Sequence, residues 1–106
     1  MKRAISVLLL LTAGCTSQVV STQTHVQSYV GSNISDVQNL YLTPHSQAIG
    51  LFDSKTYAWV ETQQKFESGN TQHSFSDPYR DCTVIWVADQ NGIINSGSYF
   101  GKDCLR

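Results

Sequence analysis

The feature that most constrains the fold is a strand–turn–strand pattern near the C-terminus. An almost continuous apolar run from Cys82 to Ala88 carries the β-branched and aromatic residues typical of a strand. It is followed by Asn91-Gly92, the strongest short hairpin signal, after which residues 93–100 return as a second strand. This third of the chain is therefore predicted to be an antiparallel hairpin.

The turn also predicts the register of that hairpin. With Asn91-Gly92 as the two loop residues, Gln90 pairs with Ile93, and Cys82 then lies opposite Gly101. A turn over residues 101–103 would bring the last cysteine, Cys104, back over the end of the first strand. Gly97, inside the returning strand, predicts either a bulge or close packing by a neighbouring element.

The N-terminus has the order of an export signal. Lys2 and Arg3 precede an apolar stretch over residues 4–11, and the small residues 12–14 lead to Cys15. The stretch is too short to span a bilayer, which takes roughly 20 residues. A buried N-terminal core helix is the alternative, and the order of charge, apolar stretch and small residues favours the signal. We therefore assign residues 1–14 to a signal peptide.

The ending Leu11-Thr12-Ala13-Gly14-Cys15 resembles the lipobox of bacterial lipoproteins. The resemblance implies that the Cys15 thiol receives a diacylglyceryl group, that cleavage precedes Cys15, and that its new amino group is acylated. Thr16 follows where an aspartate often retains such proteins in the inner membrane. The absence of an aspartate there favours the outer membrane, with the domain facing the periplasm. Two or more acyl chains give lasting attachment.

The net charge limits which partners the processed chain is expected to bind. The sequence has 7 Lys and Arg against 8 Asp and Glu, and cleavage removes two of the basic residues, Lys2 and Arg3. A mildly acidic chain lacks the electrostatic footprint of a nucleic-acid-binding protein. It also lacks a polybasic patch for anionic lipid. The expected partners are the membrane, reached through the lipid anchor, and an envelope protein.

Cys82 and Cys104 remain once Cys15 carries lipid. An even pair in an exported chain predicts a disulfide. Two free thiols or a metal site are the alternatives, and two cysteines without a close histidine are too few ligands for a typical zinc site. We expect no metal and no cofactor.

Between the anchor and the hairpin, the chain is predicted to start with a tether and a helix. Residues 15–28 carry the lipidated cysteine and a Ser-, Thr- and Gln-rich stretch that reads as a flexible tether, with room for a short strand near its end. Asn33 can cap a helix that runs to about Leu42, with Asp36 as its capping-box partner. Thr43-Pro44 ends it. The folded domain is expected over residues 29–106.

The middle of the chain is expected to add one strand. Residues 56–66 favour a strand, whereas residues 71–81 are polar, contain Pro78 and are predicted to be a loop. Trp59 and Trp86 are expected in the core. The predicted fold class is α+β, with one or two short helices packed on a three-stranded antiparallel meander.

No pattern in the sequence predicts catalysis. His25, His45 and His73 are not adjacent to a serine or cysteine in a recognisable nucleophile motif, and phosphate-binding and zinc-protease motifs are absent. Carboxylates near turns are most simply solvated turn residues. Tyr79-Arg80, in a polar loop before Cys82, is the preferred candidate for partner binding, because an exposed aromatic residue beside an arginine is typical of an interface anchor.

The mature region also resembles the SmpA/OmlA (BamE-like) family of small outer-membrane lipoproteins. The matching segments are Gly31 to Val37 with Thr43-Pro44, Tyr57-Ala58-Trp59, Cys82 to Ile94, and Gly101-Lys102-Asp103-Cys104. The resemblance implies two short helices on a three-stranded sheet. It also implies binding without chemistry, in which the domain helps to assemble or stabilise envelope proteins. An inhibitory or exclusion lipoprotein that binds a surface receptor or an incoming enzyme is the alternative function.

The anchor leads to a direct prediction. Cys15→Ala removes the thiol that would carry lipid, so the chain should keep its first residues and carry no acyl group. Mass spectrometry of membrane and soluble fractions, with and without the substitution, measures cleavage, acylation and the Cys82–Cys104 bond together. An unsubstituted chain that is soluble and still begins with Met1 would contradict the anchor.

Overall fold

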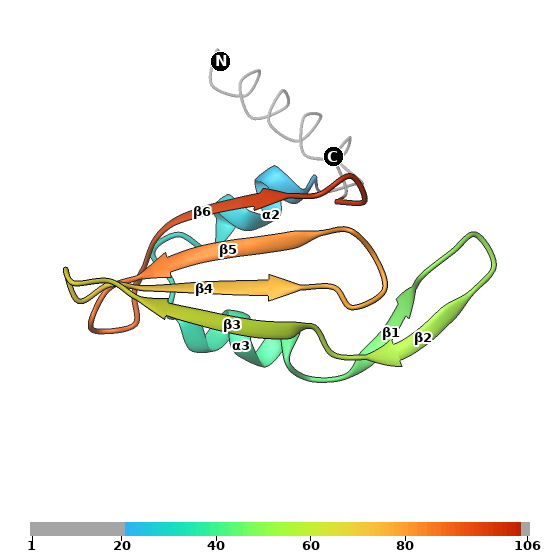
Figure 1. The fold of residues 1–106 in the computed structure, drawn as a ribbon, viewed down its shortest axis with the longest axis horizontal. Helices are drawn as coiled ribbons and strands as arrows, with labels where there is room; N and C mark the ends of the chain where they lie inside the picture. Colours follow the sequence, from blue (N-terminus) through green and yellow to red (C-terminus); the bar gives the residue numbers. More distant parts are fainter. Residues whose placement is uncertain (1–20, 105–106) are drawn as a thin grey trace, which may run out of the picture.

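A computed structural model describes residues 21–104, and the fold is α+β with two short helices packed on antiparallel sheet (Figure 1). In chain order the elements are α2 (Thr22–Ser28), α3 (Ile34–Tyr41), β1 (His45–Ala48), β2 (Ser54–Tyr57), β3 (Val60–Lys65), β4 (Thr71–Ser76), β5 (Thr83–Ala88) and β6 (Ile94–Phe100). Strands β3-β4-β5-β6 form a four-stranded meander, and β1-β2 form a separate hairpin. Within residues 21–104 no helix is long and apolar enough to cross a membrane.

The predicted register of the C-terminal hairpin is confirmed along most of β5 and β6. Thr83 pairs with Phe100, which places Cys82 beside Gly101 as expected. The turn differs from the prediction, because Asp89 N–H donates to the Ile93 carbonyl and leaves a three-residue loop. An irregularity between Val87 and Ala88 absorbs the extra residue and restores the predicted register beyond it.

The prediction of a three-stranded meander is wrong, because residues 71–76 form β4 rather than a loop. β4 lies between β3 and β5 and pairs along its whole length with both. The inward-facing positions of β4 are hard to recognise in the sequence, because one of its two buried residues is the polar His73 and the other is Phe75. The single strand predicted over residues 56–66 is likewise two strands, β2 and β3, that belong to different sheets.

The prediction of a flexible tether is wrong for residues 22–28, which form helix α2. Thr24 N–H donates to the Ser21 side chain and caps the helix. Thr22 and Val26 are buried, and α2 packs on β5 and β6. The apolar face escaped notice because the polar Thr22 and the half-buried His25 occupy positions where large apolar side chains are expected. Cys15, the signal peptide over residues 1–14 and the start of the tether lie outside the described residues.

The helix predicted from Asn33 is confirmed as α3. The Asn33 side chain accepts a hydrogen bond from Ser35 N–H at 3.0 Å, and the helix ends before Pro44. Ile34, Val37 and Tyr41 form its buried face, against the core of the four-stranded sheet. Both helices thus cover the same face of that sheet.

The structure joins Cys82 to Cys104 by a disulfide, as predicted. The two Cα atoms are 4.9 Å apart, and both residues are buried. In the chain-entropy account, closing a loop with a separation of 22 residues stabilises the fold by about 3 kcal/mol. The bond holds the C-terminal turn over the end of β5.

Gly97 marks close packing by a neighbour, one of the two readings predicted for it. A Cβ atom at this position would lie 2.5 Å from Val26 Cγ1 and 3.0 Å from the Trp86 ring. Helix α2 therefore approaches β6 at a distance that only glycine permits. Gln27 Nε2 also donates to the Gly97 carbonyl at 3.0 Å, which fixes the helix along the strand.

We predict that Gly97→Ala lowers the free energy of unfolding by about 1–3 kcal/mol, because the added methyl group overpacks the contact with Val26. Urea unfolding measures the change. Gly50→Ala is the matched control, since its Cβ would meet only Asp53 Cβ at 3.7 Å. In a Val26→Ala background, where the contact is already absent, Gly97→Ala should cost less than in the parent chain. A Gly97→Ala chain as stable as the parent would contradict the packing of α2 on β6.

Candidate functional site

The described residues contain a cleft of about 460 Å³. It lies at one end of the four-stranded sheet, next to the Cys82–Cys104 disulfide. Helix α2, helix α3, the β1-β2 hairpin and the C-terminal turn all contribute to it, and we call it the aromatic cleft. Its lining residues are Thr22, His25, Tyr41, Gln47, Ala48, Tyr57, Trp59, Asp77, Arg80, Cys82, Val84, Asp103 and Cys104. Segments far apart in the sequence therefore meet at one site.

Tyr41 is the centre of the aromatic wall. Its ring centroid lies 4.9 Å from that of Trp59 and 5.7 Å from that of the buried Trp86, in edge-to-face contacts. Edge-to-face pairs of this kind add roughly 0.5–1.5 kcal/mol each beyond area burial. Burial raises the pKa of Tyr41 above its usual range, so its hydroxyl stays protonated and can donate a hydrogen bond.

Gln47 fixes the hairpin side of the cleft. Its Nε2 donates to the Tyr57 carbonyl at 2.8 Å, and its Oε1 accepts from Trp59 Nε1 at 2.7 Å. Both ends of one amide are thus used to hold β1, β2 and the Trp59 indole in register. Trp59, predicted to be in the core, is partly buried and packs against it.

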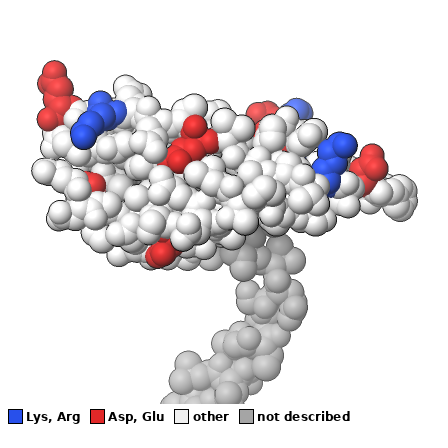
Figure 2. Space-filling model, turned by 90° about the horizontal axis from the view of Figure 1, so that it is seen from below, with Lys and Arg blue, Asp and Glu red and all other residues white. Residues whose placement is uncertain are grey.

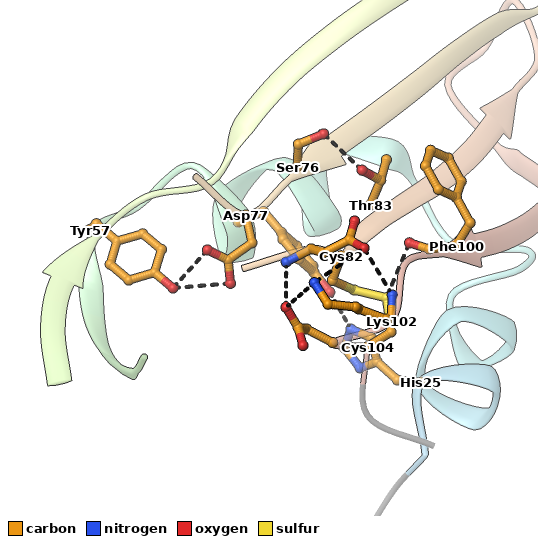
Figure 3. The surroundings of a disulfide bond; sticks show 12 residues. His25, Tyr57, Ser76, Asp77, Cys82, Thr83, Phe100, Lys102 and Cys104 are labelled. Atoms are coloured by element: carbon orange, nitrogen blue, oxygen red, sulfur yellow. Dashed lines mark hydrogen bonds and ion pairs between the residues drawn. A yellow bond between two sulfur atoms is a disulfide. The ribbon is translucent and has the colours of Figure 1, made fainter. Parts of the chain in front are cut away.

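Asp77 organises the rim beside the disulfide (Figure 3). The Tyr57 hydroxyl donates to both carboxylate oxygens, at 2.9 and 3.0 Å, and Tyr79 N–H donates to one of them. Burial, followed by the hydrogen bond to Asp77, raises the pKa of Tyr57 to about 12. The phenol is therefore neutral at physiological pH and binds Asp77 as a donor.

A second carboxylate holds the C-terminal turn. Asp103 accepts a hydrogen bond from Asp81 N–H at 2.8 Å, and this bond lowers the pKa of Asp103, with help from the charges of Lys102 and Arg80. Asp103 N–H in turn donates to the Asp81 carbonyl. Asp103 is thus held as an anion on the wall of the aromatic cleft.

The predicted partner-binding pair lies at this cleft. Arg80 is one of its lining residues, and its Nη1 contacts the Ala48 carbonyl at 3.4 Å. Tyr79 is 52% exposed, and its ring lies 4.6 Å from that of Tyr57. Lys55 Nζ lies 5.9 Å from the centre of the Tyr79 ring. The pair is therefore part of the rim and not an isolated loop.

Sequence reasoning missed most of the other lining groups. His25 was placed in the tether, and Gln47 and Asp77 carried no motif. Their proximity depends on α2 and on the β1-β2 hairpin, which the sequence patterns did not predict. The aromatic character of Trp59 and Tyr57 was the only local signal for this wall of the cleft.

Two of the histidines are hydrogen-bonded to side chains on other elements of the fold. His25 Nε2 lies 2.9 Å from the Tyr41 hydroxyl, and His73 Nδ1 lies 2.7 Å from Glu61 Oε2. Gln38 on α3 also donates to Glu61, so the second cluster ties α3 to the sheet. Residues 21–104 contain no group of three His, Cys, Asp or Glu side chains placed to hold a metal ion.

The arrangement is suited to holding a ligand. The cleft offers aromatic faces, neutral phenols and an arginine on its rim. On the face seen in Figure 2, charged residues lie singly or beside a residue of opposite charge, with no broad area of one sign. Binding on this face therefore depends on local contacts more than on a long-range field.

Comparison with known proteins finds no family model, no curated protein and no solved structure that matches this chain. The aromatic cleft is therefore interpreted from its own geometry.

The environment of His25 predicts a pH dependence of stability. Burial lowers the pKa of His25 below 6.5 in the folded chain. The unfolded chain then binds the proton first as the pH falls through 6.5, so the free energy of unfolding should decrease. Urea unfolding from about pH 8 to about pH 5 measures this slope.

His25→Gln should flatten that slope, whereas His45→Gln, a substitution at an exposed position, should leave it unchanged. An unchanged slope in His25→Gln would contradict the assignment.

Proposed function

We propose that this chain is an exported binding protein, held in the outer membrane by lipid on Cys15 and facing the periplasm. Its aromatic cleft binds a segment of an envelope protein and so assists the assembly or stability of that protein. The observation that carries the proposal is the cleft itself, in which an aromatic wall and Arg80 converge beside a disulfide.

The size and lining of the cleft support a protein partner. A volume of about 460 Å³ is within the range of specific ligand sites, and it accommodates one or two large side chains of a bound segment. Aromatic residues with an arginine are the composition of protein-interface hot spots. The lining groups His25 and Tyr41 are hydrogen-bonded to each other, which fixes this wall of the cleft for a bound segment.

Arg80 supports a partner segment with an acidic group. Within residues 21–104 its guanidinium makes only the 3.4 Å contact to the Ala48 carbonyl. A guanidinium has five N–H donors, which leaves a bidentate carboxylate contact open. The two carboxylates of the cleft already accept other hydrogen bonds, Asp77 from Tyr57 and Tyr79 and Asp103 from Asp81 N–H, so they compete weakly for that role.

The proposed location is supported by the cysteines and the signal. The Cys82–Cys104 disulfide fits an oxidising compartment such as the periplasm. The lipobox resemblance at Cys15 supplies the attachment. Two helices on an antiparallel sheet agree with the coarse fold expected of the BamE-like family, while the fourth strand and the β1-β2 hairpin depart from it.

Photo-crosslinking tests the partner. A photoreactive phenylalanine at Tyr79 in living cells should yield an adduct with an outer-membrane protein or its assembly machinery. Arg80→Glu should reduce the adduct about tenfold, which corresponds to about 1.4 kcal/mol. Lys65→Glu makes the same charge change at the far end of β3 and should have no effect.

Two outcomes would contradict the proposed function. One is the absence of any protein adduct at Tyr79 in cells whose membranes hold the chain. The other is an adduct with a surface receptor or an incoming enzyme, which would instead assign an inhibitory role.

A further inference from the structure

The β1-β2 hairpin ends in two fully displayed apolar side chains. Leu51 is 89% exposed and Phe52 is 95% exposed, the highest values among the large apolar residues of the described chain. They lie in a short loop that Ile49 N–H closes by donating to the Asp53 carbonyl at 3.0 Å. We call residues 49–53 the hairpin tip.

The hairpin tip is held away from the core by a firmly attached base. Gln47 bonds to the Tyr57 carbonyl and to Trp59, and the Tyr57 hydroxyl bonds to Asp77. In Figure 1 the hairpin extends beyond the end of the four-stranded sheet. The exposed pair is therefore presented by the fold, because the base of the same hairpin is packed and hydrogen-bonded.

The tip is convex. The aromatic cleft takes lining residues from the hairpin base, Gln47, Ala48 and Tyr57, but none from residues 49–53. A protein that covered Leu51 and Phe52 would have to provide a matching pocket. A lipid bilayer accepts a protruding apolar pair without one, since its hydrocarbon is fluid.

We propose that the hairpin tip inserts into the phospholipid bilayer as a second membrane contact. The proposal rests on the lipid anchor at Cys15 that forms part of the proposed function. Leu51 and Phe52 would enter the boundary between headgroups and acyl chains, while the flanking Asp53, Ser54 and Lys55 stay among the headgroups.

Chain length places the tip within reach of the membrane. Five residues, 16–20, separate Cys15 from Ser21, and even fully extended they hold the two within about 20 Å of each other. Thr22 at the start of α2 and Ala48 on β1 line the same cleft. The start of α2 and the base of the hairpin therefore border the same cleft.

Because the lipid anchor already holds the chain at the membrane, a weak apolar contact is sufficient for the hairpin tip to insert. Two apolar side chains alone give marginal membrane affinity, but a tether this short converts their insertion into an intramolecular step. Asp53 and Lys55 have opposite charges, so anionic headgroups should repel the loop little. The ligand is the hydrocarbon boundary of the bilayer, and no particular headgroup is required.

The two contacts would also orient the domain. With the start of α2 on one wall of the aromatic cleft and the base of the hairpin on another, a membrane contact at both would hold the cleft close to the bilayer surface. A partner segment would then be bound where a membrane protein leaves the lipid.

Depth-dependent fluorescence quenching tests the proposal. The full processed chain carrying Phe52→Trp is reconstituted in vesicles of phosphatidylethanolamine and phosphatidylglycerol that contain phospholipids with a nitroxide on the acyl chain. The emission added by the new tryptophan should fall at least about twofold, as expected for a side chain at the headgroup–acyl boundary. Phe66→Trp, in the β3–β4 turn at the other end of the sheet, is the matched control and should show no added quenching.

The outcomes separate the tip from the anchor. Chains that float with the vesicles and show no added quenching at position 52 would overturn the membrane contact of the tip while leaving the anchor intact. The same holds for equal quenching at positions 52 and 66. Chains that do not float with the vesicles would overturn the anchor, and with it the proposal that depends on it.

Discussion

The fold depends on the buried indole of Trp86. Its Nε1 donates to the Val26 carbonyl of helix α2 at 2.9 Å, and no part of the side chain is exposed. Its ring lies within aromatic contact of Tyr41 on α3 and Phe75 on β4. One residue of β5 thus joins both helices to the sheet. The indole N–H would cost about 1–3 kcal/mol if left without a partner, so its hydrogen bond also selects the position of α2.

That position of α2 creates one wall of the aromatic cleft. Because Val26 packs on Trp86 and Gly97, the residue before it, His25, faces Tyr41, and the His25 Nε2 atom lies 2.9 Å from the Tyr41 hydroxyl. The disulfide fixes another wall of the cleft, because it holds the C-terminal turn beside β5. The cleft therefore depends on both helix α2 and the C-terminal turn, which supply residues of its lining.

The sequence predicted the parts of the fold whose signals are local. The Asn33 cap, the Pro44 stop and the register of β5 with β6 each depend on residues within one or two elements, and the structure agrees with them. Helix α2 and strand β4 were missed because polar residues, Thr22 and His73, occupy their inward positions. For His73 that burial is permitted by Glu61 on the neighbouring strand, a partner that no local pattern predicts.

The same difference between local signals and tertiary contacts decides which residues of the candidate site could be predicted from the sequence. Tyr79 and Arg80 could be selected from composition and loop context, whereas the groups around them come from segments between residues 22 and 104 that only the tertiary fold brings together. Leu51 and Phe52 show the reverse case, because an apolar pair in a sequence suggests burial and only the fold reveals exposure. A hairpin folded back over the aromatic cleft would bury them and close the cleft. An exposed tip and an open cleft are therefore consequences of one arrangement, in which Gln47 and Tyr57 hold the hairpin outward.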